Sequence, residues 1–307
     1  MISQPTTLGA IDDRPHRRQR ALAFDSYVAL APATTIALLC FYGFAAWTFI
    51  ISLTGSHLLP VYDFVGLDQY YRLFATPRWW LAMRNLAVYA TCLIGGCIPL
   101  GYGLAILVER VGVWGSIGRA IFMLPLCLSF VVTGVIWQWL LNPGLGIQHT
   151  VRDLGWTGFH FDWLVRADRA IYTIAIAGIW QQTGMCMAVF LAGLRNIGPT
   201  VWRISNLDGI PVWRVYLHVV TPMLRPAFVT STVLLASSAV KSYDLVVTLT
   251  GGGPGFSSDL PAHFVVDLIG RQELGMGAAG ACMLLCAAAA VVGPYLCYEL
   301  RRRNASQ

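Results

Sequence analysis

Charged side chains are scarce in this sequence. They make up 12% of the 307 residues, whereas soluble domains usually carry about 25%, and 56% of the residues are apolar. There is one lysine, Lys241, and the other cationic residues are arginines that lie between long apolar runs. A nucleic-acid-binding face would gather its cations on one surface, so the net charge of +6 fits anchoring at a membrane better. We therefore expect membrane lipid as the surroundings of this chain, and no nucleic-acid partner.

Three catalytic signatures are also missing. The phosphate-binding loop G-x-x-x-x-G-K-[S/T] requires a glycine before its lysine, and Val240 stands before the only lysine. The six histidines are scattered without the paired spacing that metal ligands show. A Gly-x-Ser-x-Gly nucleophile elbow is absent. The sequence thus predicts no catalytic residue, no metal site and no cofactor in this chain, and any ATP hydrolysis would fall to another polypeptide.

Long runs without a charge are abundant instead. Crossing the hydrocarbon core, which is about 30 Å thick, takes about 20 apolar residues. Runs of that length cover residues 27–53, 85–108, 120–142, 170–194 and 274–298, and a sixth, 226–249, is interrupted by Lys241 and Asp244. In lipid every backbone amide must be paired within its own segment, so the runs predict helices. The predicted fold class is an all-α membrane protein with six transmembrane helices.

The arginines predict the orientation. With the N-terminus in the cytoplasm, thirteen arginines fall in cytoplasmic segments and seven in outer ones. Positive residues favour the cytoplasmic side. We therefore expect a cytoplasmic tail over residues 1–26, one transmembrane domain over 27–299 and a second cytoplasmic tail over 300–307.

The segment 195–225, between the fourth and fifth predicted spans, is too long for a simple connector and too apolar for a solvated one. Three apolar residues recur at three-residue spacing on one face of a short predicted helix: Val201, Ile204 and Leu207. Gly209 stands where a helix C-terminus commonly needs a left-handed residue, and Pro222 follows a second predicted helix. The two helices either pack on the chain's own bundle or dock into a partner, and the spacing leaves both open.

The stretch DGIPVWRVYLHVVTPMLRP in this segment resembles the second half of the cytoplasmic EAA loop of binding-protein-dependent ABC importer permeases. In that family a proline follows fourteen residues after the aspartate of an Asp-Gly pair, as Pro222 follows Asp208 here. Upstream the resemblance departs, because Arg203, Ile204 and Ser205 occupy the Glu-Ala-Ala places. The family glutamate's contact with the ATPase is therefore not carried over. The residues that the resemblance and the spacing assign to an ATPase-coupling loop are Arg203, Ser205, Leu207, Asp208, Gly209 and Pro222.

Two further stretches resemble the sugar-transporting branch of that family, the maltose and glycerol-3-phosphate type. FVGLDQYYRLFATPRWWLAMRN, residues 64–85, is similar to the outer segment before its second span, and KSYDLVVTLTGGGPG, residues 241–255, to its fifth helix and the following outer loop. The resemblance implies a type I ABC importer bundle in a bacterial inner membrane. A second permease subunit, expected to give a heterodimer, would complete a pore for a sugar, oligosaccharide, polyol or sugar derivative. Two ATP-binding subunits, which hold ATP and Mg, and an extracytoplasmic solute-binding protein are the other implied partners.

Polar and aromatic residues inside the predicted spans mark a candidate substrate path. A lone charge at mid-membrane costs about 2.5–3.5 kcal/mol on insertion scales. Lys241 and Asp244 stand three apart on a predicted helix, so they share a face and form either a structural ion pair or part of a polar pore lining. Five further residues either bond neighbouring helices or serve the same path through hydrogen bonds and ring stacking: Trp137, Gln138, Gln181, Gln182 and Tyr243.

A secondary transporter or channel for a small polar solute is the alternative function. Such transporters often show internal repeats. No repeat is visible in this sequence, and a loop of the EAA type would have no role in such a protein. A membrane-embedded enzyme ranks third, because no catalytic constellation is present.

Overall fold

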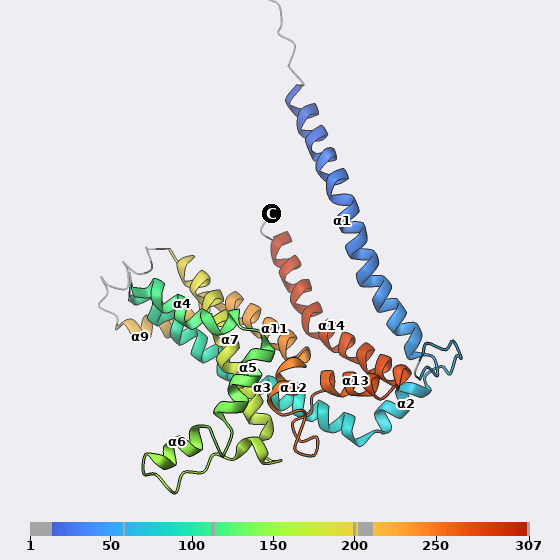
Figure 1. The fold of residues 1–307 in the computed structure, drawn as a ribbon. Coiled ribbons are helices and arrows are strands. Elements are labelled where there is room, and N and C mark those ends of the chain that lie inside the picture. The colour runs from blue at the N-terminus through green and yellow to red at the C-terminus, as the bar shows by residue number, and fades with distance from the viewer. Residues whose placement is uncertain (1–13, 58, 112–113, 199–200, 202–210, 306–307) are drawn as a thin grey trace, which may run out of the picture. The chain divides into compact units, whose positions relative to one another are not determined.

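The computed structural model describes residues 14–57, 59–111, 114–198, 201 and 211–305 (Figure 1). Within these residues the structure is helical, apart from turns, loops and one isolated bridge between Thr54 and Phe64. The predicted all-α class is therefore confirmed. The chain divides into two units, one ending at Ile50 and the other beginning at Ile51.

The N-terminal unit is a single long helix. α1 covers Arg14–Ser52, and its part Leu30–Ser52 is long and apolar enough to cross a membrane. These 23 residues extend about 35 Å at about 1.5 Å per residue. Large apolar side chains such as Leu39 and Phe44 are 70% and 71% exposed. Such exposure suits a helix that is surrounded by lipid rather than water.

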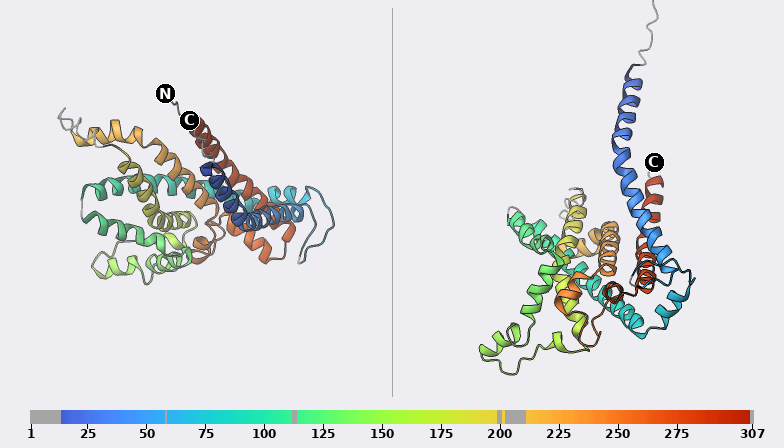
Figure 2. Two further views of the ribbon diagram at one scale, coloured as in Figure 1. Left: turned by 90° about the horizontal axis from the view of Figure 1, so that it is seen from above. Right: turned by 45° about the vertical axis from the view of Figure 1, so that its right-hand side comes forward.

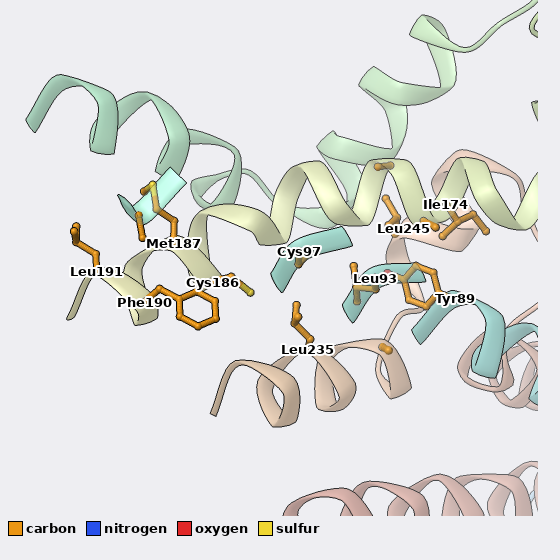
Figure 3. Close-up of a cluster of buried hydrophobic side chains, with 14 of the residues drawn as sticks. Tyr89, Leu93, Cys97, Ile174, Cys186, Met187, Phe190, Leu191, Leu235 and Leu245 are labelled. Carbon is orange, nitrogen blue, oxygen red and sulfur yellow. The ribbon is translucent and has the colours of Figure 1, made fainter. Parts of the chain in front are cut away.

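Three helices form the core of the second unit, and their bounds are α3 (Pro77–Arg110), α7 (Ala170–Arg195) and α11 (Arg225–Val240). α3 and α7 pack side by side along their lengths, and α11 lies against both (Figure 2). Figure 3 shows buried side chains of all three helices meeting in one cluster, among them Leu93, Phe190 and Leu235. Gly101 of α3 permits the close approach, because a Cβ there would lie 2.5 Å from the Cβ of Cys186. These helices are the frame on which the functional segments are held.

Within the described residues, four helices are long and apolar enough to span a membrane alone: Leu30–Ser52 of α1, α3, α7, and the segment Leu274–Cys297 of α14 (Leu274–Ala305). Two bent helix pairs also qualify, each as one broken span. The described residues thus hold four to six candidate spans, and the second pair, residues 212–240, overlaps the predicted fifth span 226–249 only in α11. The second pair joins α9 (Val212–Val215), η2 (Tyr216–Val220) and α10 (Thr221–Met223) to α11. The described elements that belong to no candidate span are α2 (Asp68–Ala75), α6 (Ile147–Asp153), η1 (Trp163–Val165), α12 (Asp244–Leu249) and α13 (Pro261–Gly270).

The third predicted span is not one continuous helix. α4 (Trp114–Cys127) and α5 (Phe130–Leu140) meet at a bend of 96°. The hydroxyl of Ser129 accepts a hydrogen bond from the amide of Val132 at 3.2 Å, which caps the start of α5. The prediction of an unbroken helix over 120–142 is therefore wrong, because a local cap competes with helix continuation.

The fifth predicted span is also interrupted. α11 ends at Val240, and the chain becomes helical again only in α12 (Asp244–Leu249). The amides of Lys241 and Ser242 donate to carbonyls three residues back, each at 3.2 Å, which tightens and ends the last turn. The prediction of an unbroken helix over 226–249 is wrong for this reason. The break carries Lys241, Ser242 and Tyr243.

Candidate functional site

Five of the residues predicted to couple to an ATPase lie outside the described residues: Arg203, Ser205, Leu207, Asp208 and Gly209. The sixth, Pro222, lies in the first turn of α10. The run of α9, η2 and α10 confirms that a helix follows Gly209. This helix then meets α11 at a bend of 68°.

The α9–α10 helix has two faces with different surroundings. Val215 and Val220 are buried in the same cluster as Phe190, so one face packs on the chain's own bundle. Trp213 and Leu217 are 58% and 57% exposed on the helix. The two alternatives left open by the spacing are therefore compatible, since one face is covered and apolar side chains remain available elsewhere.

The charged residues of the candidate substrate path lie on either side of the break in the fifth span. Lys241 is the C-terminal cap of α11, and Asp244 is the first residue of α12. Both side chains are exposed, and none of the ion pairs among the described residues joins them. The ion pair, one of the two alternatives, is not formed, because the helix ends between the two residues and three-residue spacing no longer puts them on one face. Each charge is instead opposite in sign to the partial charge at its own helix end, which is a favourable placement: Lys241 at a C-terminus and Asp244 at an N-terminus.

The two glutamines of α7 bond to neighbouring elements. Gln181 donates to the carbonyl of Leu128 at 2.8 Å, which ties α7 to the bend between α4 and α5. Gln182 donates to the hydroxyl of Ser238 on α11. Both side chains are buried. This is the interhelical arrangement that the sequence allowed for them, whereas Gln138 on α5 is exposed.

Trp137 contacts Trp180 of α7 edge to face, with ring centroids 5.9 Å apart. The two rings border a largely apolar cavity of about 690 Å³ between α3, α4, α5 and α7. Its lining does not include Lys241, Tyr243 or Asp244. Of the predicted path residues, Trp137 lines this cavity, while Lys241, Tyr243 and Asp244 lie at the α11–α12 break.

An ionic cluster that the sequence did not predict connects α3 with the segment before α13. Nε of Arg78, in the first turn of α3, donates to Oδ2 of Asp259 at 2.6 Å. The Asp259 side chain is fully buried, and Arg78 also donates to Asp267. The Arg78 guanidinium lies 3.9 Å from the centroid of the Phe256 ring. The cation is therefore held by two carboxylates and an aromatic face.

Two further side chains complete this cluster. The Asn85 amide donates to the carbonyls of Ser257 and Asp259, both at 3.0 Å. Nδ1 of His263 lies 2.6 Å from Oδ1 of Asp259, and the imidazole stacks on Tyr243 with ring centroids 6.2 Å apart. The stretches 64–85 and 241–255, which carried the resemblance to the sugar branch, thus adjoin one cluster. The sequence signal that could have indicated this cluster is the four-residue spacing of Asp259, His263 and Asp267, because residues four apart on a helix share a face.

Comparison with known proteins adds to this geometry. Residues 97–300 match the family described as the binding-protein-dependent transport system inner membrane component. The chain belongs to this family. It is a permease, the multi-pass membrane component of an ABC importer, and not an enzyme. The family that the EAA-like loop indicated is therefore confirmed.

Relatives of the permease are similar along most of its length. A probable ABC transporter permease protein of Pyrococcus horikoshii is 34% identical over 275 residues, which cover 89% of this chain and 94% of that one. The xylose/arabinose import permease protein XacH of Haloferax volcanii is 32% identical over 266 residues, 85% of this chain and 83% of the relative. A bacterial ABC transporter for the import of the acidic polysaccharide alginate has the same fold, with a TM-score of 0.74, 19% identity, and coverage of 94% of this chain and 99% of that one.

Neighbouring charges also set the pKa of Asp267 in this permease. Burial by itself would raise the pKa of Asp267, but hydrogen bonds from Arg78 and Arg271, together with their charges, lower the pKa below its usual value. Asp267 therefore stays ionised and keeps bridging α3 and α13. Nε of Arg271 lies 3.1 Å from Oδ2 of the same carboxylate.

Proposed function

We propose that this permease, together with a second permease subunit, forms the translocation path of an ATP-driven importer for a carbohydrate. Sugars, oligosaccharides, polyols and sugar derivatives are the substrate class. The observation that carries the proposal is the break in the fifth span, where Lys241 and Asp244 are exposed beside Tyr243. The xylose/arabinose permease relative and the alginate importer fold support the same class.

The physical argument concerns what these side chains can face. A charge exposed to hydrocarbon is costly, so intramembrane charges face a partner or a water-filled cavity. A broken helix at that depth is tolerated where it lines such a cavity. Lysine donates and aspartate accepts hydrogen bonds, and a tyrosine ring offers an apolar face to a sugar ring. Together these groups suit a hydroxyl-rich solute.

The proposed partners bind on the two sides of the membrane. On the cytoplasmic side, the segment 195–225 would dock one of two ATP-binding subunits, which hold ATP and Mg, and the second permease subunit would dock the other. The exposed Trp213 and Leu217 in that segment support this assignment. On the outer side, a solute-binding protein would deliver the substrate. Both termini are assigned to the cytoplasm of a bacterial inner membrane on the distribution of arginines.

Reconstitution tests the proposal. The permease would be assembled in proteoliposomes with the second permease, the ATPase and the solute-binding protein encoded beside it, and uptake of radiolabelled sugars would be measured. We expect accumulation that requires ATP, and at least a fivefold loss of uptake in Lys241→Met, the order of one lost hydrogen bond to a charge. Arg84→Met, on an exposed part of α3, serves as control. Sugar uptake without the ATPase would favour a secondary transporter or channel, and transport of non-carbohydrate solutes alone would refute the substrate class.

A further inference from the structure

We propose that His263 is a positioning residue of the substrate path. Asp259, which is paired with Arg78, holds the imidazole of His263 in one orientation, and the imidazole in turn holds the ring of Tyr243 in place. The inference rests on the proposed function, because it takes Tyr243 as part of the path. The proposal gives the ionic cluster of Arg78, Asp259 and Asp267 a role in transport in addition to holding helices together.

The carboxylate of Asp259 is held in one position by partners on both of its oxygens. The side chain of Asp259 is fully buried, and its two oxygens have different partners. Oδ2 accepts from Nε of Arg78 at 2.6 Å, and Oδ1 lies 2.6 Å from Nδ1 of His263. The backbone of Asp259 is also fixed, since its carbonyl accepts from Asn85 at 3.0 Å. Loss of either partner would leave a buried carboxylate oxygen without a hydrogen bond, which costs free energy. The two contacts of Asp259 are therefore maintained together.

The carboxylate determines how the imidazole is oriented. Because an ionised carboxylate only accepts, Nδ1 of His263 is the donor. Gly252 approaches the same ring closely, and a Cβ there would lie 2.8 Å from Cε1 of His263. Only glycine also suits the φ of +80° at this position. The ring is thus held by a hydrogen bond on one atom and by backbone close to another.

The oriented ring then contacts the break in the fifth span. Its plane lies at 25° to the ring of Tyr243, with the centroids 6.2 Å apart. Tyr243 stands between the two helices of the break, next to the exposed Asp244. No helix fixes its backbone on both sides, so a packed neighbour is needed to select one ring position. Sites that act on a substrate depend on such support from a surrounding layer of residues.

Two substitutions separate the two contacts of His263. His263→Asn retains a donor for Asp259 but removes the ring that stacks on Tyr243. His263→Phe retains a ring but leaves Oδ1 of Asp259 without its donor. The matched control is His149, which pairs with Asp153 at 2.9 Å with the same four-residue spacing but is 57% exposed. His149→Asn and His149→Phe therefore remove the same chemistry away from the path.

The first measurement does not depend on transport. A fluorinated tyrosine would be placed at position 243 alone by codon suppression, and its ¹⁹F resonance recorded in the purified complex. We expect both His263 variants to shift or broaden the resonance, and both His149 variants to leave it unchanged. Arg78→Lys keeps a positive charge beside Asp259 but removes the guanidinium Nε that donates to it, so this variant should shift the resonance as well. An unchanged resonance in the His263 variants overturns the inference, whether or not the complex transports a sugar.

The second measurement separates positioning from docking of the solute-binding protein. In proteoliposomes, we expect the maximal uptake rate of both His263 variants to fall about fivefold to tenfold, the size expected for the loss of one hydrogen bond or one ring contact. The KM for loaded binding protein should change less than about twofold. A rise in KM at an unchanged maximal rate would assign His263 to the docking surface and refute the positioning role. Failure of the wild type to take up any carbohydrate would refute the proposed function instead.

Discussion

At the residue scale, Arg78 is the cation on which the ionic cluster with Asp259 and Asp267 depends. Its guanidinium contacts Asp259 and Asp267 and is only 14% exposed. Removing one partner of such a pair leaves a buried charge uncompensated, at a cost of about 3–5 kcal/mol. We expect Arg78→Met to lower the thermal unfolding temperature of the purified permease strongly. The double change Arg78→Met with Asp259→Leu should recover much of that loss, and a double variant less stable than either single one would contradict the interpretation.

Asp267 gives the cluster a dependence on pH. Its pKa is lower in the folded protein than the usual 3.8. A lowered pKa contributes stability that is fully present above the unfolded value and is lost as pH falls through the folded one. Wild type should therefore be more stable than Asp267→Asn at neutral pH, and the difference should shrink below about pH 4, close to the usual aspartate pKa. Thermal unfolding measured from pH 7 to pH 3 checks this, and a difference that grows on acidification would reverse the sign.

At the element scale, the break between α11 and α12 separates Lys241 from Asp244. Groups without a shared contact have additive effects, within about 0.3–0.5 kcal/mol. We expect the losses of uptake rate in Lys241→Met and Asp244→Asn to multiply in the double variant. A double variant that transports better than either single one would show that the two charges interact in the assembled transporter.

The crossing of α5 and α12 depends on one small residue. A Cβ at Gly134 would lie 1.7 Å from the hydroxyl oxygen of Thr248, so the helices touch where no side chain intervenes. Overpacking of this kind costs about 1–3 kcal/mol. Gly134→Ala should lower the yield of folded permease and its unfolding temperature. Gly95→Ala in α3, where nothing lies within 4 Å, is the control and should be neutral.

At the scale of the whole molecule, the exposed Trp213 in the predicted coupling loop provides a test of assembly. Buried aromatic residues dominate many interfaces, and their loss often costs more than about 2 kcal/mol. We expect Trp213→Ala to reduce retention of the ATPase during purification and to lower substrate-stimulated ATP hydrolysis. Trp156→Ala, 74% exposed in the segment between α5 and α7, should leave both unchanged. Full retention in Trp213→Ala would place the ATPase contact elsewhere.

The sequence by itself determined the class of the molecule. Charge-free runs of about 20 residues have one solution in lipid, because backbone groups must be paired within the segment. The first, second, fourth and sixth spans were predicted for this reason, and the EAA-like stretch around Asp208 and Pro222 identified the family. These features are local, so a short window of sequence contains the information.

Only the tertiary structure decided where the spans break and which residues meet. Ser129 and Ser242 are ordinary residues in apolar runs, and whether they end a helix depends on hydrogen bonds and packing that a composition pattern does not contain. Of the two alternatives for Lys241 and Asp244, the ion pair is not formed, because one non-helical turn separates the residues. Arg78 and Asp259 are 181 residues apart, and their pairing follows from the packing of α3 against the segment before α13. Contacts at that separation depend on the whole fold, since no local spacing specifies them.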